Sequence, residues 1–212
     1  MLLVIANRNY SSWSLRAWLA LKHTGAAFDE IVIPLFQPNT AEEIRRHSPS
    51  GRLPVLRDGD LLVWDSLAIG EYLAERFPEA QLWPEDPAAR AHARSVSAEM
   101  HSGFPSMRQN LGMNIRARKQ RELNPETERE VARVVALWTE ARTRYGAGGP
   151  YLYGHFTVAD AMYAPVVTRF VTWGVQLTGA AAEYVRTILA LPSLQAWIDL
   201  ARKEPWTVPQ YD

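Results

Sequence analysis

The chain has no cysteine among its 212 residues. This absence excludes disulfide bonds, thiolate metal sites and a thiol nucleophile supplied by the protein. The five histidines show no metal-ligand spacing, so we expect no metal. No apolar run approaches the ~18 residues of a membrane span, and the short apolar start at residues 1–6 lacks the basic beginning of a signal peptide. These absences favour a cytoplasmic protein without a membrane partner.

Net charge is also lacking, because 23 Lys and Arg residues balance 23 Asp and Glu residues. This balance provides no general attraction to nucleic acid or to an anionic membrane. The densest basic cluster comprises Arg116, Arg118, Lys119 and Arg121, and no aromatic residues are interleaved with it. Such a cluster indicates a solvated face at a helix end, and we expect no nucleic-acid partner.

Strand and helix patterns alternate in the first third of the chain. Short aliphatic runs at residues 2–5 and 30–33 predict two strands with a helix between them. Residues 55–64 predict a β-hairpin around an Asp-Gly turn, and residues 67–77 predict a helix. Three prolines within residues 78–87 then mark a linker.

After the linker the pattern is helical throughout. An apolar run with helical spacing follows Pro125. Thr157 and Asp160 have the spacing of a capping box before another apolar run. The sequence therefore predicts a mixed α/β domain at residues 1–78 and an all-helical domain at residues 87–212.

The most informative segment is Ser-Gly-Arg-Leu-Pro-Val-Leu at residues 50–56. A proline at the mouth of an apolar strand removes a ladder hydrogen bond, and a cis bond is one way to turn the chain there. The backbone of Leu53 would then be free to pair with an extended, peptide-like ligand. Further on, Asp65 and Ser66 precede a helix, with Ser66 as the expected N-cap, and the free N–H groups there favour a bound carboxylate. Together these features suit a small peptide with an α-amino-acid end.

These features resemble the glutathione transferase family, in which a cis-proline precedes the third strand and an acid-Ser pair opens the third helix. Residues 9–22, beginning Asn-Tyr-Ser-Ser-Trp-Ser-Leu-Arg, are similar to the family's active-site turn and first helix. Residues 157–161, Thr-Val-Ala-Asp-Ala, are similar to the capping motif of its second domain. The resemblance implies a thioredoxin-like, glutathione-binding domain at residues 1–78 and an all-helical, substrate-binding domain at residues 87–212. It also implies a homodimer that uses glutathione as a substrate or cofactor.

In this family a hydroxyl at the start of the first helix stabilises the glutathione thiolate. Lowering a thiol pKa of ~8.5 by ~2 units corresponds to roughly 2.7 kcal/mol. Similarity to the zeta class places the catalytic hydroxyl on Ser11, whereas counting back from the helix arginine, as in theta and delta enzymes, places it on Ser12. Both stay candidates, with Ser11 slightly preferred; Tyr10 is a competing hydroxyl, and serines here can also simply cap the helix. Trp13 replaces the zeta-class cysteine, which argues against maleylacetoacetate isomerase activity.

The resemblance also implies which residues bind glutathione: Arg52, Leu53, Pro54, Asp65 and Ser66. Leu53 would pair through its backbone with the cysteinyl segment. Ser66 and the helix start would take the γ-glutamyl carboxylate, and Asp65 would meet the ammonium group. Arg52 could hold a carboxylate or be a solvated loop charge.

The second substrate would lie between the domains. Its candidate wall residues are large apolar or aromatic side chains and one histidine: Phe36, His101, Phe104, Met107 and Trp173. Each of them could equally be a core residue, and the sequence identifies no acid–base partner for His101.

We therefore predict a glutathione transferase that conjugates the glutathione thiolate to small apolar electrophiles. A glutathione-dependent isomerase or dehalogenase uses the same thiolate and stays open as an alternative. A non-catalytic binding or regulatory protein that keeps the fold is the other alternative.

Overall fold

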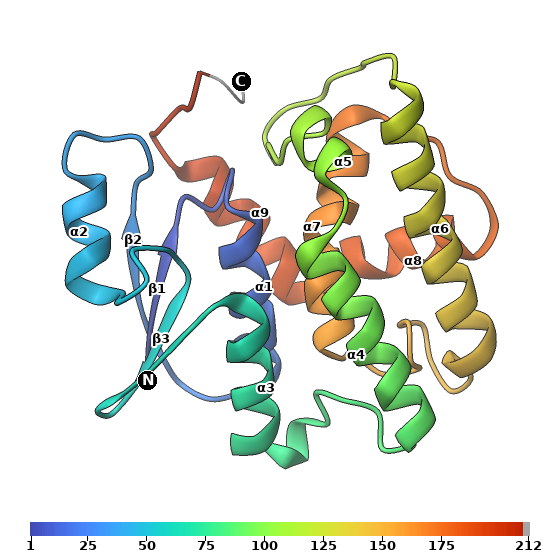
Figure 1. Cartoon of the computed structure of the whole chain (residues 1–212), viewed down its shortest axis with the longest axis horizontal. Coiled ribbons are helices and arrows are strands. Elements are labelled where there is room, and N and C mark those ends of the chain that lie inside the picture. The colour runs from blue at the N-terminus through green and yellow to red at the C-terminus, as the bar shows by residue number, and fades with distance from the viewer. Residues whose placement is uncertain (210–212) are drawn as a thin grey trace.

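The computed structural model of the chain describes residues 1–209. Its amino-terminal part is a four-stranded sheet (Figure 1), formed by β1 (Leu2–Ala6), β2 (Asp29–Ile33), β3 (Val55–Asp58) and β4 (Leu61–Trp64). The strand order is β2-β1-β3-β4, with β1 and β2 parallel and the other neighbours antiparallel. The helices of this part are α1 (Ser12–His23), α2 (Thr40–His47) and α3 (Ser66–Arg76). The predicted thioredoxin-like fold is confirmed.

The β3–β4 hairpin determines which residues meet at one edge of the sheet. It turns at Gly59, whose φ of 59° lies in the left-handed region that glycine adopts without a Cβ clash. In its register Val55 pairs with Trp64. The segments that flank the hairpin, residues 52–54 and 65–66, are therefore brought side by side.

The rest of the described chain is mainly helical, as predicted. After a 3₁₀ turn at Pro78–Ala80 come α4 (Pro87–Ser102), α5 (Pro105–Asn110), α6 (Pro125–Tyr145), α7 (Val158–Trp173), α8 (Gly179–Ala190) and α9 (Pro192–Lys203). Most side chains of α7 are buried, and the helix packs against both α1 and α4. The predicted capping box of Thr157 and Asp160 is present at its start.

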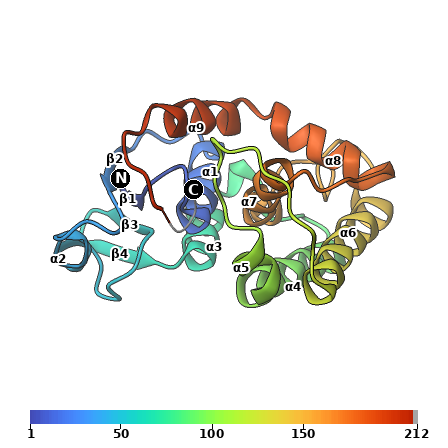
Figure 2. The same ribbon diagram turned by 90° about the horizontal axis from the view of Figure 1, so that it is seen from above.

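One hydrophobic core runs through both parts of the chain. Helix α1 stands between the sheet and α7 (Figure 2) and supplies Trp18, which is 1% exposed. The Trp18 ring meets the Trp197 ring of α9 edge-on, with 5.3 Å between their centroids. The segment between α3 and α4 coincides with the predicted linker. Because the two parts share their core, the domain boundaries at residues 78 and 87 stay a prediction.

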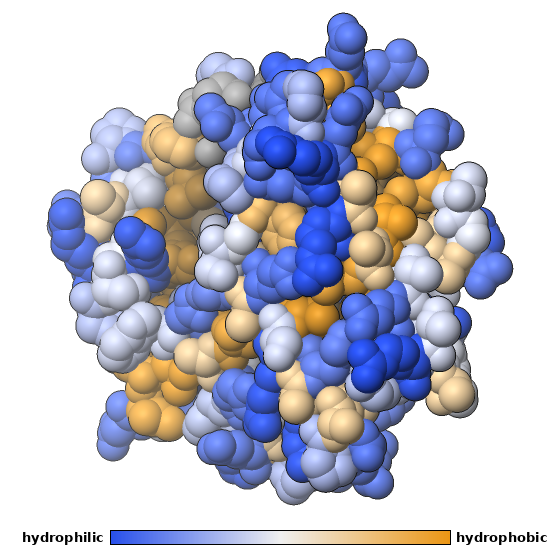
Figure 3. All heavy atoms as spheres, turned by 45° about the vertical axis from the view of Figure 1, so that its right-hand side comes forward, coloured by the Kyte–Doolittle hydropathy of each residue, from blue (hydrophilic) through white to orange (hydrophobic). Residues whose placement is uncertain are grey.

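The surface of the helical part mixes polar and apolar side chains. On the face shown in Figure 3, hydrophobic side chains gather in separate patches with hydrophilic side chains between them. Within residues 1–209, no helix has both the length and the apolar composition needed to cross a membrane.

The basic cluster of residues 116–121 lies in the loop between α5 and α6, so the predicted helix end is wrong, although Arg118 and Arg121 are solvent-exposed as predicted. The Arg116 guanidinium donates to the backbone oxygens of Glu204 and Trp206 and to the hydroxyl of Tyr10. These hydrogen bonds connect the loop to the segment that follows α9.

Candidate functional site

A cleft of about 590 Å³ opens where the sheet, the start of α3 and the end of α4 meet. It is lined by side chains of four segments: Trp13, Ser50, Arg52, Leu53, Pro54, Trp64, Asp65, Ser66 and His101. All five residues predicted to bind glutathione lie in it. Sequence reasoning missed Ser50 and Trp64, although each is near a predicted residue in the chain.

Leu53 presents its backbone to this cleft. The Leu53–Pro54 peptide bond is cis, and the strand β3 begins only at Val55. Within residues 1–209, neither the N–H nor the C=O of Leu53 forms a hydrogen bond. Both groups are therefore available to an extended ligand that pairs with the chain edge.

Asp65, not Ser66, caps helix α3, so the predicted cap is wrong by one residue. Asp65 Oδ1 accepts the N–H groups of Leu67 at 2.8 Å and of Ala68 at 3.4 Å, because its side chain reaches back over the first turn. Its φ of 78° is unusual for a residue with a Cβ, and such backbone strain gathers at binding sites. Ser66 is the first helical residue; its Oγ is buried, and within residues 1–209 it has no hydrogen-bond partner. That hydroxyl and the helix start can receive an anion.

The two candidate catalytic serines are buried, and their hydroxyl groups are used differently. Ser11 caps α1: its Oγ accepts the N–H of Ser14 at 3.3 Å and donates to Ser14 Oγ at 2.9 Å. Ser12 Oγ accepts from Arg169 Nη2 at 3.3 Å, and in the described part of the chain it donates to no acceptor. Neither serine lines the cleft, whereas Trp13 of the same turn does line it. Ser12 is therefore the serine whose proton is still free to be donated.

Trp13 separates the cleft from a buried cluster of arginines. The guanidinium carbons of Arg16 and Arg108 lie 4.6 Å and 5.1 Å from the centre of its ring. Arg16 is 1% exposed, and no described residue accepts a hydrogen bond from any of its three guanidinium nitrogens. Burial, together with the charges of Arg108 and Arg169, lowers the pKa of Arg16. A buried cation without acceptors is unfavourable, so Arg16 is the member of this cluster whose charge an anion could satisfy.

Of the predicted substrate-binding residues, His101 is the one that the structure brings to the cleft. Phe36 is on the loop after β2 and is 59% exposed. Phe104 and Met107 are buried in the shared core. Trp173 lines a separate cavity of about 500 Å³ against α6. Helical spacing identified apolar positions correctly, but it does not specify which neighbour each one meets.

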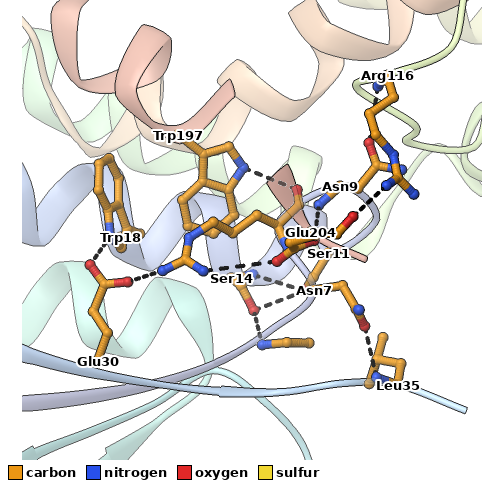
Figure 4. A network of polar contacts seen from close by, with 12 residues as sticks. Asn7, Asn9, Ser11, Ser14, Trp18, Glu30, Leu35, Arg116, Trp197 and Glu204 are labelled. Carbon is orange, nitrogen blue, oxygen red and sulfur yellow. Dashed lines mark hydrogen bonds and ion pairs between the residues drawn. The ribbon is translucent and has the colours of Figure 1, made fainter. Parts of the chain in front are cut away.

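The loop between β1 and α1 leads to Ser11 and Ser12. Hydrogen bonds from segments far away in the chain hold this loop in place (Figure 4). The carboxylate of Glu204 accepts the N–H of Arg8 at 2.7 Å and that of Asn9 at 3.1 Å. Asn9 Oδ1 in turn accepts the N–H of Arg116 at 3.0 Å. Burial raises the pKa of Glu204, since these donors only partly replace water. The position of the serine turn thus depends on the segment after α9.

The titratable groups do not form a metal centre in the part of the chain that the structure describes: no three His, Asp or Glu side chains there are grouped to hold an ion.

The chain is similar to known proteins over most of its length. The family "Glutathione S-transferase, N-terminal domain" matches residues 10–76, and "Glutathione S-transferase, C-terminal domain" matches residues 124–200. The maleylacetoacetate isomerase of Rattus norvegicus is 28% identical over 194 residues, which cover 89% of this chain and 87% of the relative. A stringent starvation protein A homolog of Haemophilus ducreyi is 27% identical over 72% of this chain and 68% of its own. A crystal structure of a glutathione transferase homolog from Burkholderia, with bound glutathione, has the same fold, with a TM-score of 0.69 and 23% identity over 95% of this chain and 97% of that one.

Proposed function

The chain belongs to the glutathione S-transferase family, and from this premise we propose that it binds glutathione in the cleft and activates the thiol for attack on an electrophile. The observation that carries the proposal is the meeting of Leu53, Asp65 and Ser66 in one cleft beside Trp13. The proposal includes the predicted homodimer and the cytoplasmic location.

Each part of glutathione has a matching group in the cleft. The unpaired backbone of Leu53 would pair with the cysteinyl residue. The buried hydroxyl of Ser66 and the start of α3 would take the γ-glutamyl carboxylate. Asp65 Oδ1 is occupied by backbone N–H groups, so Oδ2 would face the ammonium group. Arg52, which also lines the cleft, would hold the glycine carboxylate.

Ser12 is the hydroxyl that we propose for the thiolate. Its oxygen accepts from Arg169, which leaves the proton to be donated to sulfur and makes the hydroxyl a stronger donor. The hydroxyl of Ser11 already donates a hydrogen bond to Ser14 Oγ. The hydrogen bonds thus favour Ser12, whereas similarity to the zeta class slightly favoured Ser11.

The variant Ser12→Ala should raise the pKa of the bound glutathione thiol by about one unit, because one hydrogen bond to an anion is worth roughly 1.4 kcal/mol. Glutathione affinity at low pH should change little, since Leu53, Asp65 and Ser66 are unaltered. The ultraviolet absorbance of the thiolate, followed against pH in the complex, measures this pKa, and calorimetry measures the affinity.

The matched control is Ser11→Ala, which removes the cap of α1. It should lower the free energy of unfolding by about 1 kcal/mol and leave the thiol pKa unchanged. The same thiol pKa in the parent protein and in both variants would contradict a serine mechanism. A parent protein that gives no heat with glutathione would favour the non-catalytic alternative.

A second candidate function is a glutathione-dependent isomerase or dehalogenase that acts on carboxylate-bearing substrates. The observation that favours it is the buried, unpartnered guanidinium of Arg16 behind Trp13. A substrate carboxylate that displaces the Trp13 ring would provide the acceptors that Arg16 lacks. The rat relative named maleylacetoacetate isomerase supports an isomerase, whereas Trp13 in place of the zeta cysteine argues against that particular substrate.

The variant Arg16→Met should lower kcat/KM for a carboxylate-bearing electrophile by about 10-fold or more. For a neutral electrophile of similar shape, kcat/KM should stay within about 2-fold of the parent value. Paired kinetic assays with the two electrophiles measure the ratio. Arg57→Met, an exposed change on β3 outside the cleft, is the control and should alter neither value. An equal loss for both electrophiles would show that Arg16 does not select an anion.

A further inference from the structure

A histidine from the helical part of the chain faces the acid that caps α3. His101, near the end of α4, has its Nε2 atom 3.2 Å from Oδ2 of Asp65. The other oxygen of Asp65, Oδ1, accepts the N–H groups of Leu67 and Ala68. The two oxygens of this carboxylate therefore face different elements: Oδ1 faces the first turn of α3, and Oδ2 faces the end of α4.

The surroundings of His101 define how its ring is held. The ring meets that of Trp13 edge-on, with 5.1 Å between centroids and an interplanar angle of 83°. Nδ1 is buried, and no described residue forms a hydrogen bond with it. With a carboxylate facing Nε2 and no acceptor at Nδ1, the hydrogen of a neutral imidazole belongs on Nε2.

The charges around this contact make Asp65 important to the cleft. Asp65 is the acidic side chain among the described cleft residues, while Arg52 contributes a positive charge. The cations Arg16 and Arg108 lie against the Trp13 ring, which the His101 ring also contacts. Among the described cleft residues, the counter-charge for a ligand ammonium group is therefore Asp65 Oδ2, which has lone pairs for both the imidazole and the ligand.

We propose that His101 is a positioning residue for the ammonium group of glutathione: it donates from Nε2 to Asp65 Oδ2 and fixes that carboxylate where the γ-glutamyl amine binds. This inference rests on the proposed function, because it takes glutathione as the ligand of the cleft. It adds that recognition of the amino end depends on α4, a helix of the other part of the chain. A histidine that merely packed between Trp13 and α3 would not distinguish ligands by their amino group.

The test compares glutathione with its analogue that lacks the α-amino group, glutaryl-cysteinyl-glycine. Calorimetric titrations compare the full-length parent protein with His101→Ala. The variant should bind glutathione about 10-fold more weakly than the parent does, and its affinity for the analogue should stay within about 2-fold of the parent value. His101→Gln places an amide N–H near the position of Nε2 and should recover most of the loss. In an Asp65→Asn background, His101→Ala should have no further effect on the ratio of the two affinities.

The matched control is His92→Ala on the same helix. His92 also faces a carboxylate, with 3.6 Å between its Nε2 and Glu140 Oε1, but it lies outside the cleft. Both ligands should bind this variant as they bind the parent protein. Near-ultraviolet circular dichroism verifies that each variant is folded.

Two results would overturn the inference and separate it from the proposed function. If the parent protein binds glutathione but His101→Ala weakens both ligands equally, or neither, then His101 does not position the ammonium site. If the parent protein binds neither ligand, the proposed function itself is wrong, and this inference is overturned together with it.

Discussion

The variant Asp160→Ala should lower the free energy of unfolding by about 3 kcal/mol near neutral pH, because two buried N–H groups lose their acceptor. Asp160 is 0% exposed. Its Oδ1 accepts the N–H of Leu152 at 3.1 Å, and its Oδ2 accepts the N–H of Thr157 at 2.8 Å and the Thr157 hydroxyl at 3.0 Å. The carboxylate thus joins the start of α7, at the centre of the core, to the loop before it.

The size of this loss should depend on pH. Burial raises the pKa of Asp160 from 3.8 to about 6, since desolvation outweighs the hydrogen bonds that it accepts. Between these values the folded state binds more protons than the unfolded state, so the stability that Asp160 contributes falls as pH rises. Asp160→Ala should therefore cost more at about pH 4.5 than at about pH 7.5, by at most about 3 kcal/mol.

Urea unfolding of both proteins at the two pH values measures the difference. Asp86→Ala is the control, because Asp86 caps α4 by accepting the N–H of Ala89 at 2.7 Å but is exposed. Asp86→Ala should lower the free energy of unfolding by about 1 kcal/mol, and this decrease should be independent of pH over this range. A cost for Asp160→Ala that grew with rising pH would contradict the raised pKa.

The second large effect is expected for Glu204→Ala, with a loss of about 2–4 kcal/mol in the free energy of unfolding. Glu204 is 7% exposed, and its carboxylate is the acceptor for the N–H groups of Arg8 and Asn9. Removing it leaves the buried N–H of Asn9 and the partly buried N–H of Arg8 without this acceptor. Glu204→Gln provides one carbonyl oxygen and should lose about half as much.

The same variant should separate thiol activation from glutathione binding. The loop that Glu204 holds leads directly into Ser11 and Ser12, so its displacement should raise the pKa of the bound thiol. The affinity for glutathione should change less, because Leu53 and Asp65 lie on segments that Glu204 does not contact. Thiolate absorbance and calorimetry on the same samples measure the two quantities.

Glu30→Gln is the control for this prediction. Glu30 forms an ion pair with Arg8 and accepts a hydrogen bond from Trp18 Nε1 at 2.7 Å, but it is half-buried and does not contact the loop backbone. Glu30→Gln should lower the free energy of unfolding by about 1 kcal/mol and leave the pKa of the bound thiol unchanged. A thiol pKa raised equally by both variants would mean that the charge on Arg8, rather than the loop position, controls the thiol.

The residues that line the cleft beside the hairpin could be predicted from sequence because they are close together in the chain. The Leu53–Pro54 pair and the Asp65–Ser66 pair flank one hairpin, and the hairpin register alone brings them together. The error of one residue at the helix cap has an equally local cause. Both side chains can cap a helix, and the backbone turn at Asp65, with its positive φ, decides between them.

The order of the elements, the hairpin, the capping box at Thr157 and the placement of the five proposed ligand-binding residues beside one hairpin follow from the sequence by itself, since each depends on neighbours a few positions apart. Only the tertiary structure decided that His101 faces Asp65, that Arg16 is buried behind Trp13, and that Glu204 holds the loop before α1. The physical reason is that periodicity determines which face of a helix is buried but not which partner covers it. Packing of the shared core makes that choice, and it brings together side chains that are far apart in the chain.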